Sequence, residues 1–536
     1  MKPQSFDVPV VGGPGPRPIP WTPVWGVILA AVAVFLLATI RPGQPWDGDA
    51  ELYIIDALSI LHGGPYGAGG YVFNPDNPIN PAAYPAGFPL LLLPLLMTFG
   101  LNYLAIKVAL VLCFIGFLAL LTRIARDRLD PVAVALLIAM LGFNPFVWHF
   151  KDVVFSEFPF LLLSYGALFL VDRIDRAGAD GGTRWHGILG AAMMLAAACL
   201  VRAAGIAVIA AVAGLVLLRG RRLWRPGLAV LVLACVLILA VNHVFPADVG
   251  GYGATFDDWE LSDLPSNLVD DALSYLQGFV GLLGGNHGGV PGGVVSAVWL
   301  VLAAIGMVQV ARNRLSVFEL FFGAYMALLV AYPMTEERMR YALPVLPLLL
   351  LYGLSGIAVA AASLDRWRGH GRAVAALFLL LTVALAFVYA PQFGRQPKGR
   401  NLSVEQSEAR QLYDEVMCRV PADALIIATY PTVIALHTGR RATAAPEEAE
   451  AEDFWDFVAD SGAGWLIRGR RPMEDDARPL MKVLRPRLQP VYRNALFVLY
   501  RIRPAVPDSA VPRLAAARLM APDHPGASDP SPNNQR

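Results

Sequence analysis

The chain has 536 residues, of which 56% are hydrophobic and only 16% are charged. Soluble globular proteins carry roughly 25% charged residues, so this composition excludes an ordinary soluble protein and indicates an integral membrane protein. The 43 Lys and Arg residues balance the 42 Asp and Glu residues to a net charge of +1. Such a chain has no overall field to attract nucleic acid, and we expect no nucleic-acid partner. Three of the four cysteines lie in apolar runs, which excludes a disulfide framework and a metal site built from paired cysteines.

The chain begins with a Pro- and Gly-rich segment, 1–23, that we expect to be a disordered cytoplasmic tail. Apolar runs then recur up to residue 390, and a run of about 20 such residues can cross a bilayer. We interpret the first run as a retained span rather than a cleaved signal peptide, because it starts late and lacks a small-residue cleavage pattern. Eleven spans are predicted, at 24–40, 102–122, 131–148, 156–171, 187–201, 203–218, 228–245, 293–311, 316–332, 342–362 and 373–390.

The orientation of these spans follows from the distribution of charge. The five loops expected on the inner side carry fifteen basic residues, whereas 246–292 carries no Lys or Arg and seven acids. Basic loops stay on the cytoplasmic side of a membrane, so the N-terminus is predicted to be cytoplasmic. One assignment depends on Arg202, which interrupts the apolar stretch 187–218. That stretch is either one tilted helix or two spans that meet at the outer surface, and the charge pattern favours two.

With an odd number of spans, the region after Pro391 lies on the outer side. A polar helical segment (SVEQSEARQLYDEV) is followed there by strand-like segments (ALIIATY, GWLIR and ALFVLYR). We predict a soluble α/β domain at 392–503 in the periplasm and a disordered tail at 504–536. The predicted fold class is an α-helical polytopic membrane protein with about 11 transmembrane helices. Its transmembrane region is 24–391, with a long first outer loop at 41–101 and a small α/β outer C-terminal domain.

Carboxylates gather at the start of the first outer loop, 41–101. A helix that begins near Asp49 would place Asp49, Tyr53 and Asp56 on one face, and we expect an interfacial helix with its carboxylates in water. An enzyme of the membrane surface carries its ionisable groups in such loops, whereas a transporter carries them at mid-membrane. The alternative is that Asp47 or Asp49 only caps this helix.

The same loop continues through a Gly-, Pro- and Asn-rich stretch to Tyr84 and ends in a Pro-bounded apolar piece, 88–99. That piece is too short to span a bilayer. We interpret it as an interfacial or re-entrant helix that covers a cavity. The alternative is an ordinary span.

The second outer loop brings His149, Asp152 and Glu157 to the same side as Asp49. A histidine with carboxylates can ligate a divalent cation, and these four residues are the candidate ligands for Mg, Mn or Ca. Their spacing is not a specific metal signature. The alternative is a site without a cofactor, in which Ser156 caps the next helix and Glu157 complements its dipole.

Two arginines, Arg338 and Arg340, break the positive-inside pattern at the outer surface. Arginine presents a planar, permanently charged fork of donors that suits a phosphate. Both are therefore candidate phosphate-binding residues, as is Arg202. The alternatives are ion pairs, with Glu336 or Glu337 for the first two and with a neighbouring helix for Arg202.

Three segments of the sequence resemble the GT-C superfamily of glycosyltransferases, which includes aminoarabinose and protein O-mannosyl transferases. DGDAELYIIDALSILHGG resembles the family's first outer loop, and YPAGFPLLLLPLLMTFG resembles the Pro-rich segment before its second span. ERMRYALPVLPLLLL resembles the Arg-Tyr-x-Leu-Pro-x-x-Pro pattern of many members. The resemblance covers most of 24–500, and its short motifs indicate the superfamily well and the substrate hardly at all.

The resemblance implies transfer of a sugar from a polyprenyl-phosphate donor to a glycan, lipid or protein acceptor, with inversion at the anomeric carbon. The reaction would take place at the outer face of a bacterial cytoplasmic membrane. It needs one base for the acceptor and cationic groups for the departing phosphate. The family's essential Asp falls on Asp49, with Asp47 as the alternative, and Arg340 is the candidate phosphate clamp. Tyr53 and Tyr84 lie in the loop segments expected near the acceptor.

Two other classes of protein stay open at this point. A transporter or flippase for a lipid-linked sugar would have internal repeats and mid-membrane polar sites, and neither is evident in the sequence. A non-catalytic member of the superfamily would use Asp49 only as a helix cap. The sequence does not reveal the sugar, the acceptor or the oligomeric state.

Overall fold

The computed structural model of the protein describes residues 21–46, 48–72, 74, 81–177, 185–247, 264–283, 289–332, 337–368, 380, 383–384, 387–393, 402–446, 451–470 and 484–503. Asp47, the expected tail at 504–536 and most of the expected tail at 1–23 lie outside the described residues. Most of the expected last span, 373–390, also lies outside them.

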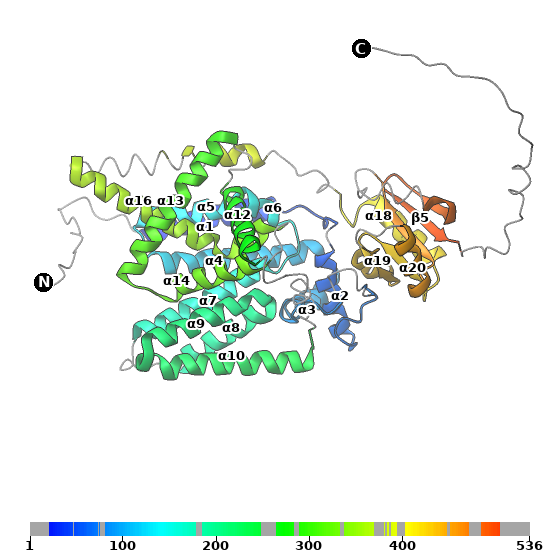
Figure 1. The fold of residues 1–536 in the computed structure, drawn as a ribbon, viewed down its shortest axis with the longest axis horizontal. Helices are drawn as coiled ribbons and strands as arrows, with labels where there is room; N and C mark the ends of the chain where they lie inside the picture. Colours follow the sequence, from blue (N-terminus) through cyan, green and yellow to red (C-terminus); the bar gives the residue numbers. More distant parts are fainter. Residues whose placement is uncertain are drawn as a thin grey trace, which may run out of the picture.

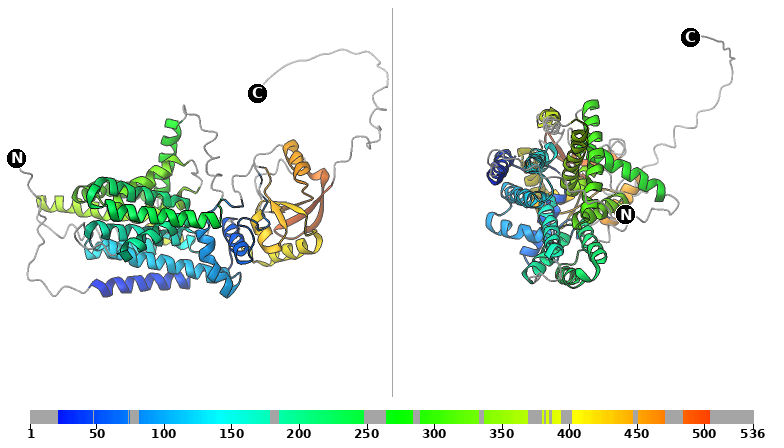
Figure 2. Two further views of the ribbon diagram at one scale, coloured as in Figure 1. Left: turned by 90° about the horizontal axis from the view of Figure 1, so that it is seen from below. Right: turned by 90° about the vertical axis from the view of Figure 1, so that its left-hand side faces the viewer.

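Each of the other predicted spans coincides with a helix or a pair of helices. Most of these helices run roughly along one axis, α13 crosses the others at a steep angle, and a small sheet with its own helices lies at one end of the bundle (Figure 1, Figure 2). Their bounds are α1 (Trp21–Ala38), α4 (Tyr103–Ala125), α5 (Pro131–Gly142), α6 (Pro145–Phe150), α7 (Glu157–Ala177), α8 (Trp185–Val201), α9 (Ile206–Arg219), α10 (Trp224–Val244), α13 (Gly289–Asn313), α14 (Val317–Ala331) and α16 (Leu346–Arg368).

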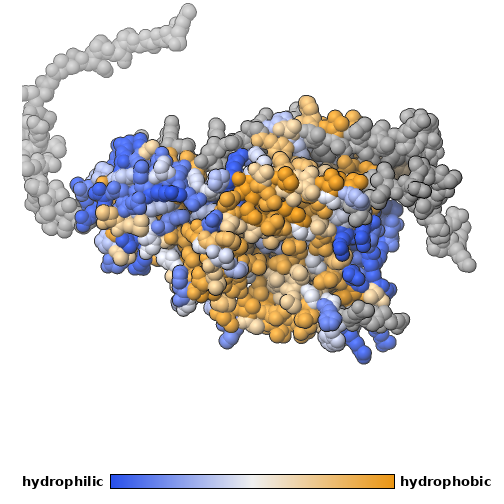
Figure 3. Space-filling view, turned by 180° about the vertical axis from the view of Figure 1, so that it is seen from behind, coloured by the Kyte–Doolittle hydropathy of each residue, from blue (hydrophilic) through white to orange (hydrophobic). Residues whose placement is uncertain are grey.

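The outer surface of the bundle is apolar. Figure 3 shows a broad hydrophobic band between two hydrophilic ends, and exposed apolar patches of this size mark a surface that lipid or another protein covers. Within the described part of the chain, five helical segments are long and apolar enough to cross a membrane: Tyr103–Ala125, Ala203–Arg222, Trp224–Val244, Gly292–Asn313 and Arg338–Ala362. The protein is therefore a multi-pass membrane protein.

Two apolar stretches are interrupted, each for a local reason. Arg202 has an extended backbone, with φ −148° and ψ 137°, and it separates α8 from α9, which confirms two helices rather than one. The predicted span 131–148 divides into α5 and α6, because the side chain of Asn144 accepts a hydrogen bond from the backbone N–H of Phe146 at 2.9 Å and Pro145 follows it. An Asn cap followed by Pro is a typical helix start.

The long outer segments contain two further helices. Helix α3 (Gly87–Phe99) matches the short apolar piece predicted at 88–99. Helix α12 (Leu264–Leu282) is missed by the interpretation of 246–292 as an acidic loop. Its buried side chains, Tyr275, Phe279 and Leu282, recur at the three- and four-residue spacing of an amphipathic helix.

The sheet has five strands in the order β2-β1-β3-β5-β4. Strand β1 is parallel to β2 and β3, and β5 is antiparallel to β3 and β4. The predicted helix and three strands are confirmed here. The two other strands were not predicted, because β2 has only three residues and β4 contains Pro490. The bounds are β1 (Leu425–Ala428), β2 (Arg441–Thr443), β3 (Trp465–Gly469), β4 (Leu488–Arg493), β5 (Phe497–Ile502), α18 (Ser407–Arg419), α19 (Pro431–Thr438) and α20 (Ala451–Ser461).

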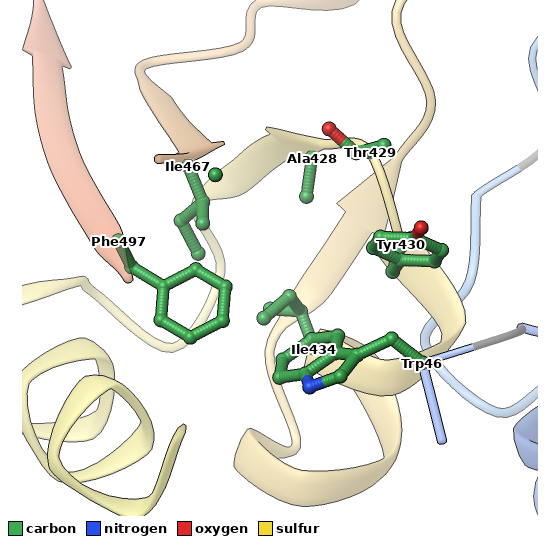
Figure 4. Close-up of a pocket in the computed structure, with 8 residues that line it drawn as sticks. Trp46, Ala428, Thr429, Tyr430, Ile434, Ile467 and Phe497 are labelled. Carbon is green, nitrogen blue, oxygen red and sulfur yellow. The ribbon is translucent and has the colours of Figure 1, made fainter. Parts of the chain in front are cut away.

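The first outer segment is fastened to this sheet at two places. Next to the edge strand β2, the N–H of Val72 donates to Ala442 O at 2.8 Å, and the N–H of Ala442 donates to Gly70 O at 3.0 Å. The indole of Trp46 packs against the rings of Phe497 and Tyr430, with centroids 5.0 Å and 5.7 Å away, and it borders a small pocket that is mostly apolar (Figure 4). The pocket holds no charged side chain, and we regard it as part of the packing between the two segments.

Candidate active site

Helix α2 (Asp49–Leu61) begins directly after Gly48, which has a φ of 103°. Glycine adopts this region of backbone space at no steric cost, whereas other residues would be strained there. Gly48 is also the N-cap residue and has no side chain that could cap the helix. Asp49 is therefore the first helical residue and is not a cap, so its carboxylate is available for other contacts.

Both oxygens of the Asp49 carboxylate contact residues that are remote in the sequence. Its Oδ2 accepts a hydrogen bond from Nη1 of Arg340 at 2.9 Å, and its Oδ1 accepts one from the hydroxyl of Tyr84 at 2.8 Å. The ring of Tyr84 lies 4.5 Å from that of Tyr53. The structure thus joins the two candidate tyrosines, the candidate base and the candidate phosphate clamp in one site.

Arg340 lies on the short helix α15 (Arg338–Ala342), which leads into α16. Its Nε donates to Oε1 of Glu157 at 2.5 Å, and its Nη1 also donates to Oε2 of Glu337 at 2.6 Å. The guanidinium stacks over the ring of Phe155 at 3.7 Å. The ion pair with Glu337, which was the alternative to phosphate binding, is present as one of three carboxylate contacts.

Arg202 reaches the same carboxylate from the break between α8 and α9. Its Nη1 donates to Oε1 of Glu157 at 2.5 Å and to the hydroxyl of Ser156 at 3.1 Å. Glu157 is the first residue of α7 and is fully buried. One buried carboxylate therefore positions two arginines.

Several donors of these arginines make no hydrogen bond within the described part of the chain. The Nε of Arg202 is buried without a partner. Arg202 donates its hydrogen bonds through Nη1, and Arg340 donates through Nη1 and Nε. Neither arginine uses its Nη2 group for a hydrogen bond to the described residues. A buried donor without a partner costs free energy until an acceptor reaches it. The arrangement is suited to an anion with several oxygens, such as a phosphate.

Access to solvent distinguishes the carboxylates of the site. The side chain of Asp49 is 17% exposed, whereas that of Glu157 is 0% exposed. A base must reach the proton that it removes. Asp49 can therefore meet a substrate, and Glu157 can only hold the arginines in place.

The four candidate metal ligands do not assemble into a metal site. Asp152 accepts hydrogen bonds from Nζ of Lys151 and from the backbone N–H of Arg41, both at 2.9 Å, while Asp49 and Glu157 bind arginines. Among the described residues, no three His, Cys, Asp or Glu side chains come together as a metal ion would require. The ring of His149 packs against Trp148 at 4.8 Å. These four residues do not fit a divalent cation as a set.

Arg338, the second arginine of the pair, lies outside this cluster of charges. Its Nη1 donates to the hydroxyl of Ser274 on α12 at 3.1 Å. A Cβ at Gly278 would lie 3.2 Å from Cγ of Arg338, so the helix passes close to the arginine stem. Arg338 therefore fastens α12, and Arg340 reaches Asp49.

Sequence reasoning missed a polar chain that links α2 to the sheet domain. The hydroxyl of Tyr103 contacts Oε1 of Glu51 at 3.3 Å and Nε2 of His437 at 3.2 Å. The imidazole of His437 is stacked on Tyr413 at 4.8 Å, and burial lowers its pKa to about 4. His437 is therefore a neutral, partly buried residue that contacts the start of α4 through Tyr103. No local pattern around it reveals the contact.

Asp56 contradicts the expectation that the carboxylates of α2 face water. It is fully buried, and burial raises the pKa of its carboxyl to about 8. Helix α2 is buried from Ala50 to Ala57, because the sheet domain, α3 and the loop cover it. It is therefore an internal helix, which amphipathic spacing alone does not reveal.

We expect Asp56→Asn to stabilise the protein relative to the wild type more at pH 8 than at pH 5. The carboxyl has a pKa of about 3.9 in an unfolded chain and about 8 in the fold. The folded protein holds this proton more tightly than the unfolded chain does. The free energy of unfolding that the proton contributes is therefore fully present below pH 4 and is lost as the pH rises toward 8, whereas Asn does not titrate. Thermal unfolding of the purified protein at both pH values tests this, with the exposed Asp423→Asn as the control. Parallel midpoints for variant and wild type would contradict it.

Neither the models of known protein families nor the curated proteins show a match to this sequence. Solved structures do. ArnT from Cupriavidus metallidurans in the apo state superposes with a TM-score of 0.53 at 14% identity, over 90% of this chain and 98% of that chain. The chain has the GT-C fold.

Two larger proteins share the GT-C fold with it. The oligosaccharyltransferase of Archaeoglobus fulgidus in the apo form matches with a TM-score of 0.51 at 12% identity, over 84% of this chain and 69% of that chain. Arabinofuranosyltransferase AftD from Mycobacteria matches with a TM-score of 0.50 at 14% identity, over 90% of this chain and 42% of that chain. The resemblance that the sequence motifs indicate is thus confirmed at the level of the fold.

Proposed function

We propose that the protein is a membrane glycosyltransferase that moves a sugar from a polyprenyl-phosphate donor to an acceptor at the outer face of the cytoplasmic membrane. The observation that carries the proposal is the ion pair between Asp49 and Arg340. It places one accessible carboxylate beside cationic donors at the end of an apolar helical bundle. In a polyprenyl-phosphate sugar, the polyprenyl chain stays in the bilayer and the sugar lies in water. The bond between the sugar and the phosphate, which breaks in the reaction, therefore lies at this level.

The chemistry that suits these groups is a single displacement. The carboxylate of Asp49 accepts the proton of an acceptor hydroxyl, whose oxygen attacks the anomeric carbon of the sugar. A bond forms between that oxygen and the anomeric carbon, and the bond to the phosphate oxygen breaks with its electron pair on the phosphate. The products are the glycoside with inverted configuration and the polyprenyl phosphate, and Asp49 returns the proton to water.

The leaving phosphate gains negative charge in this step and requires cationic donors that are already in position. Arg340 and Arg202 meet this requirement, because Glu157 holds both of them before any ligand binds. Their Nη2 groups and the Nε of Arg202 are the donors that we assign to the phosphate oxygens. No carboxylic acid is needed to protonate the leaving group, since a phosphate departs as an anion.

The similar proteins support a donor of this class. One structure of the Archaeoglobus fulgidus oligosaccharyltransferase, which matches this chain with a TM-score of 0.50 at 13% identity, is a complex with an inhibitory peptide and a dolichol-phosphate. The apolar band of Figure 3 ends near the sheet domain, so a lipid chain in the bilayer would reach the site from its side. We infer a polyprenyl phosphate as the carrier and place the sheet domain in the periplasm.

A panel of polyprenyl-phosphate sugars tests the proposal. The purified protein, reconstituted in lipid vesicles, is incubated with each donor and with detergent-solubilised cell-envelope material as the acceptor source. We expect release of free polyprenyl phosphate with at least one donor. Absence of release from every donor, in protein whose unfolding transition shows that it is folded, would contradict the proposal.

The sheet domain positions the start of α2, and we expect this to affect turnover. The hydroxyl of Thr432 donates to the backbone oxygen of Gly48 at 2.9 Å, directly before Asp49. Loss of one such hydrogen bond is worth about 1 kcal/mol, or roughly fivefold. Thr432→Val is therefore expected to lower kcat by about fivefold and to leave the donor KM unchanged.

The matched control is Thr438→Val, which removes a hydroxyl that donates to Ile434 O and accepts from the N–H of Arg440, at the opposite end of α19 from Thr432. This control should retain the kcat of the wild type. Equal kcat values for Thr432→Val and the wild type would contradict the positioning role of Thr432.

A further inference from the structure

A second group of buried charges lies at the end of the bundle opposite the sheet domain. Asp172 and Asp175, in the last turns of α7, are both buried. Figure 3 shows hydrophilic residues gathered at this end, beyond the apolar band. Four arginines from different parts of the chain pair with the two carboxylates, namely Arg128, Arg176, Arg219 and Arg314, and a fifth, Arg222, donates to the backbone oxygen of Asp175.

The contacts of this group leave positive charge in excess. Asp175 accepts from Nε of Arg219 at 3.1 Å and from Nη2 of Arg314 at 2.8 Å. Asp172 accepts from Nε of Arg176 at 2.8 Å. With Asp127, which pairs with Arg176 at 2.9 Å and with Arg126 at 3.8 Å, the described acids in this network number three against six arginines. The described residues of the network therefore carry three positive charges that its acids do not balance.

The excess charge surrounds a hollow. A cavity of about 270 Å³ is lined by Asp175, Arg176, Arg219, Arg222 and Arg314. Arg222 contributes least to the internal network, because its Nη2 donates only to the backbone oxygen of Asp175, at 3.3 Å. Four guanidinium groups around one space of this size form a site for an anion, and arginine binds phosphate through paired donors.

The surroundings of the hollow place it at the level of lipid headgroups. Trp185 and Trp224, the first residues of α8 and α10 at this end, are both exposed, and tryptophan concentrates at the membrane interface. Leu217 and Leu218, which precede Arg219 at the end of α9, are both exposed, Leu217 by 82%. A phosphate bound in the hollow would thus lie next to an apolar surface that faces the bilayer.

We propose that this hollow binds the phosphate of an anionic phospholipid, with the acyl chains along the Leu217 and Leu218 surface of α9. A phospholipid and inorganic phosphate both present phosphate oxygens that accept hydrogen bonds from arginine. Only a phospholipid would also contact the exposed leucines. Basic pockets between helices at the cytoplasmic side bind anionic headgroups in this way. The site is separate from the proposed active site, because the two lie at opposite ends of α7.

The test is lipid binding to the full-length protein in detergent, measured by native mass spectrometry. Delipidated protein is titrated with phosphatidylglycerol, with phosphatidylcholine and with inorganic phosphate. The variant is Arg222→Gln, and the control is Arg221→Gln, which makes the same change in the neighbouring exposed residue, outside the hollow. We expect phosphatidylglycerol to bind the wild type at least tenfold more tightly than phosphatidylcholine, and Arg222→Gln to lose most of that preference.

Two results would overturn the proposal. Equal loss of the preference in Arg222→Gln and Arg221→Gln would show diffuse attraction by the basic surface. Competition by inorganic phosphate at the same concentrations as the lipid would show a soluble anion as the ligand. Thermal unfolding of each variant confirms that it is folded, and because the readout is binding, failure of sugar transfer does not affect the outcome.

Discussion

Asp49→Asn is expected to lower the turnover of donor to free polyprenyl phosphate by about 10²–10⁴-fold, the range that a general base contributes. Asn preserves the shape of the side chain and can still accept a hydrogen bond from Tyr84 or Arg340, whose present contacts are at 2.8 Å and 2.9 Å. The variant should therefore fold and bind the donor. Its kcat falls because the amide cannot accept the acceptor proton.

The control is Asp56→Asn, which makes the same chemical change on the same helix. Asp56 is fully buried and has no role in the proposed reaction, so this variant should retain turnover. Release of polyprenyl phosphate, measured for both variants in vesicles, separates the two. Asp49→Asn that retains wild-type turnover would contradict the assignment of the base.

Substitutions of Arg340 are expected to have the second large effect, and two variants separate its structural and functional roles. Arg340→Ala leaves Glu157, which is fully buried, without one of its cationic partners. Removing one partner of a buried ion pair costs about 3–5 kcal/mol, so this variant should unfold at a lower temperature than the wild type. Arg340→Lys keeps the charge but loses the fork of donors, and we expect kcat/KM for the donor to fall by about 10²-fold.

Arg338→Lys is the matched control for the lysine variant, because Arg338 contacts Ser274 rather than the carboxylates of the site. It should retain kcat/KM to within about threefold. Unchanged kcat/KM in Arg340→Lys, in protein that unfolds at the temperature of the wild type, would exclude Arg340 as the phosphate clamp.

Local sequence patterns predict the helices of this protein better than they predict its tertiary contacts. The apolar runs and the charge of the loops locate the spans and the break at Arg202, because hydrophobic length and helix interruption are local properties. The division of 131–148 is also local, since Asn144 and Pro145 form a helix start, but it is hidden inside an apolar run. Helix α12 is missed because it contains the acidic pair Asp270 and Asp271, and Asp271 is buried on the same side as Tyr275 and Phe279, where an apolar residue is expected.

The candidate site shows where local reasoning ends. Asp49 and Arg340 are each identifiable as unusual charges in outer segments, but their ion pair joins residues 291 positions apart, and no local pattern encodes that contact. The role of Glu157 differs from prediction for the same reason: its arginine partners come from the break between α8 and α9 and from α15. Burial of Asp56 and His437 depends on the docking of the sheet domain, which is a tertiary property.

The most direct test of the account uses a donor with two labels, one in the phosphate and one in the sugar, presented to the wild-type protein in sealed vesicles with an acceptor. A transferase separates the labels: the phosphate label stays with the polyprenyl phosphate, and the sugar label appears in the acceptor. We predict this separation, and we predict that Asp49→Asn abolishes it. Movement of the intact, doubly labelled lipid across the bilayer without separation would contradict sugar transfer and would identify a transporter.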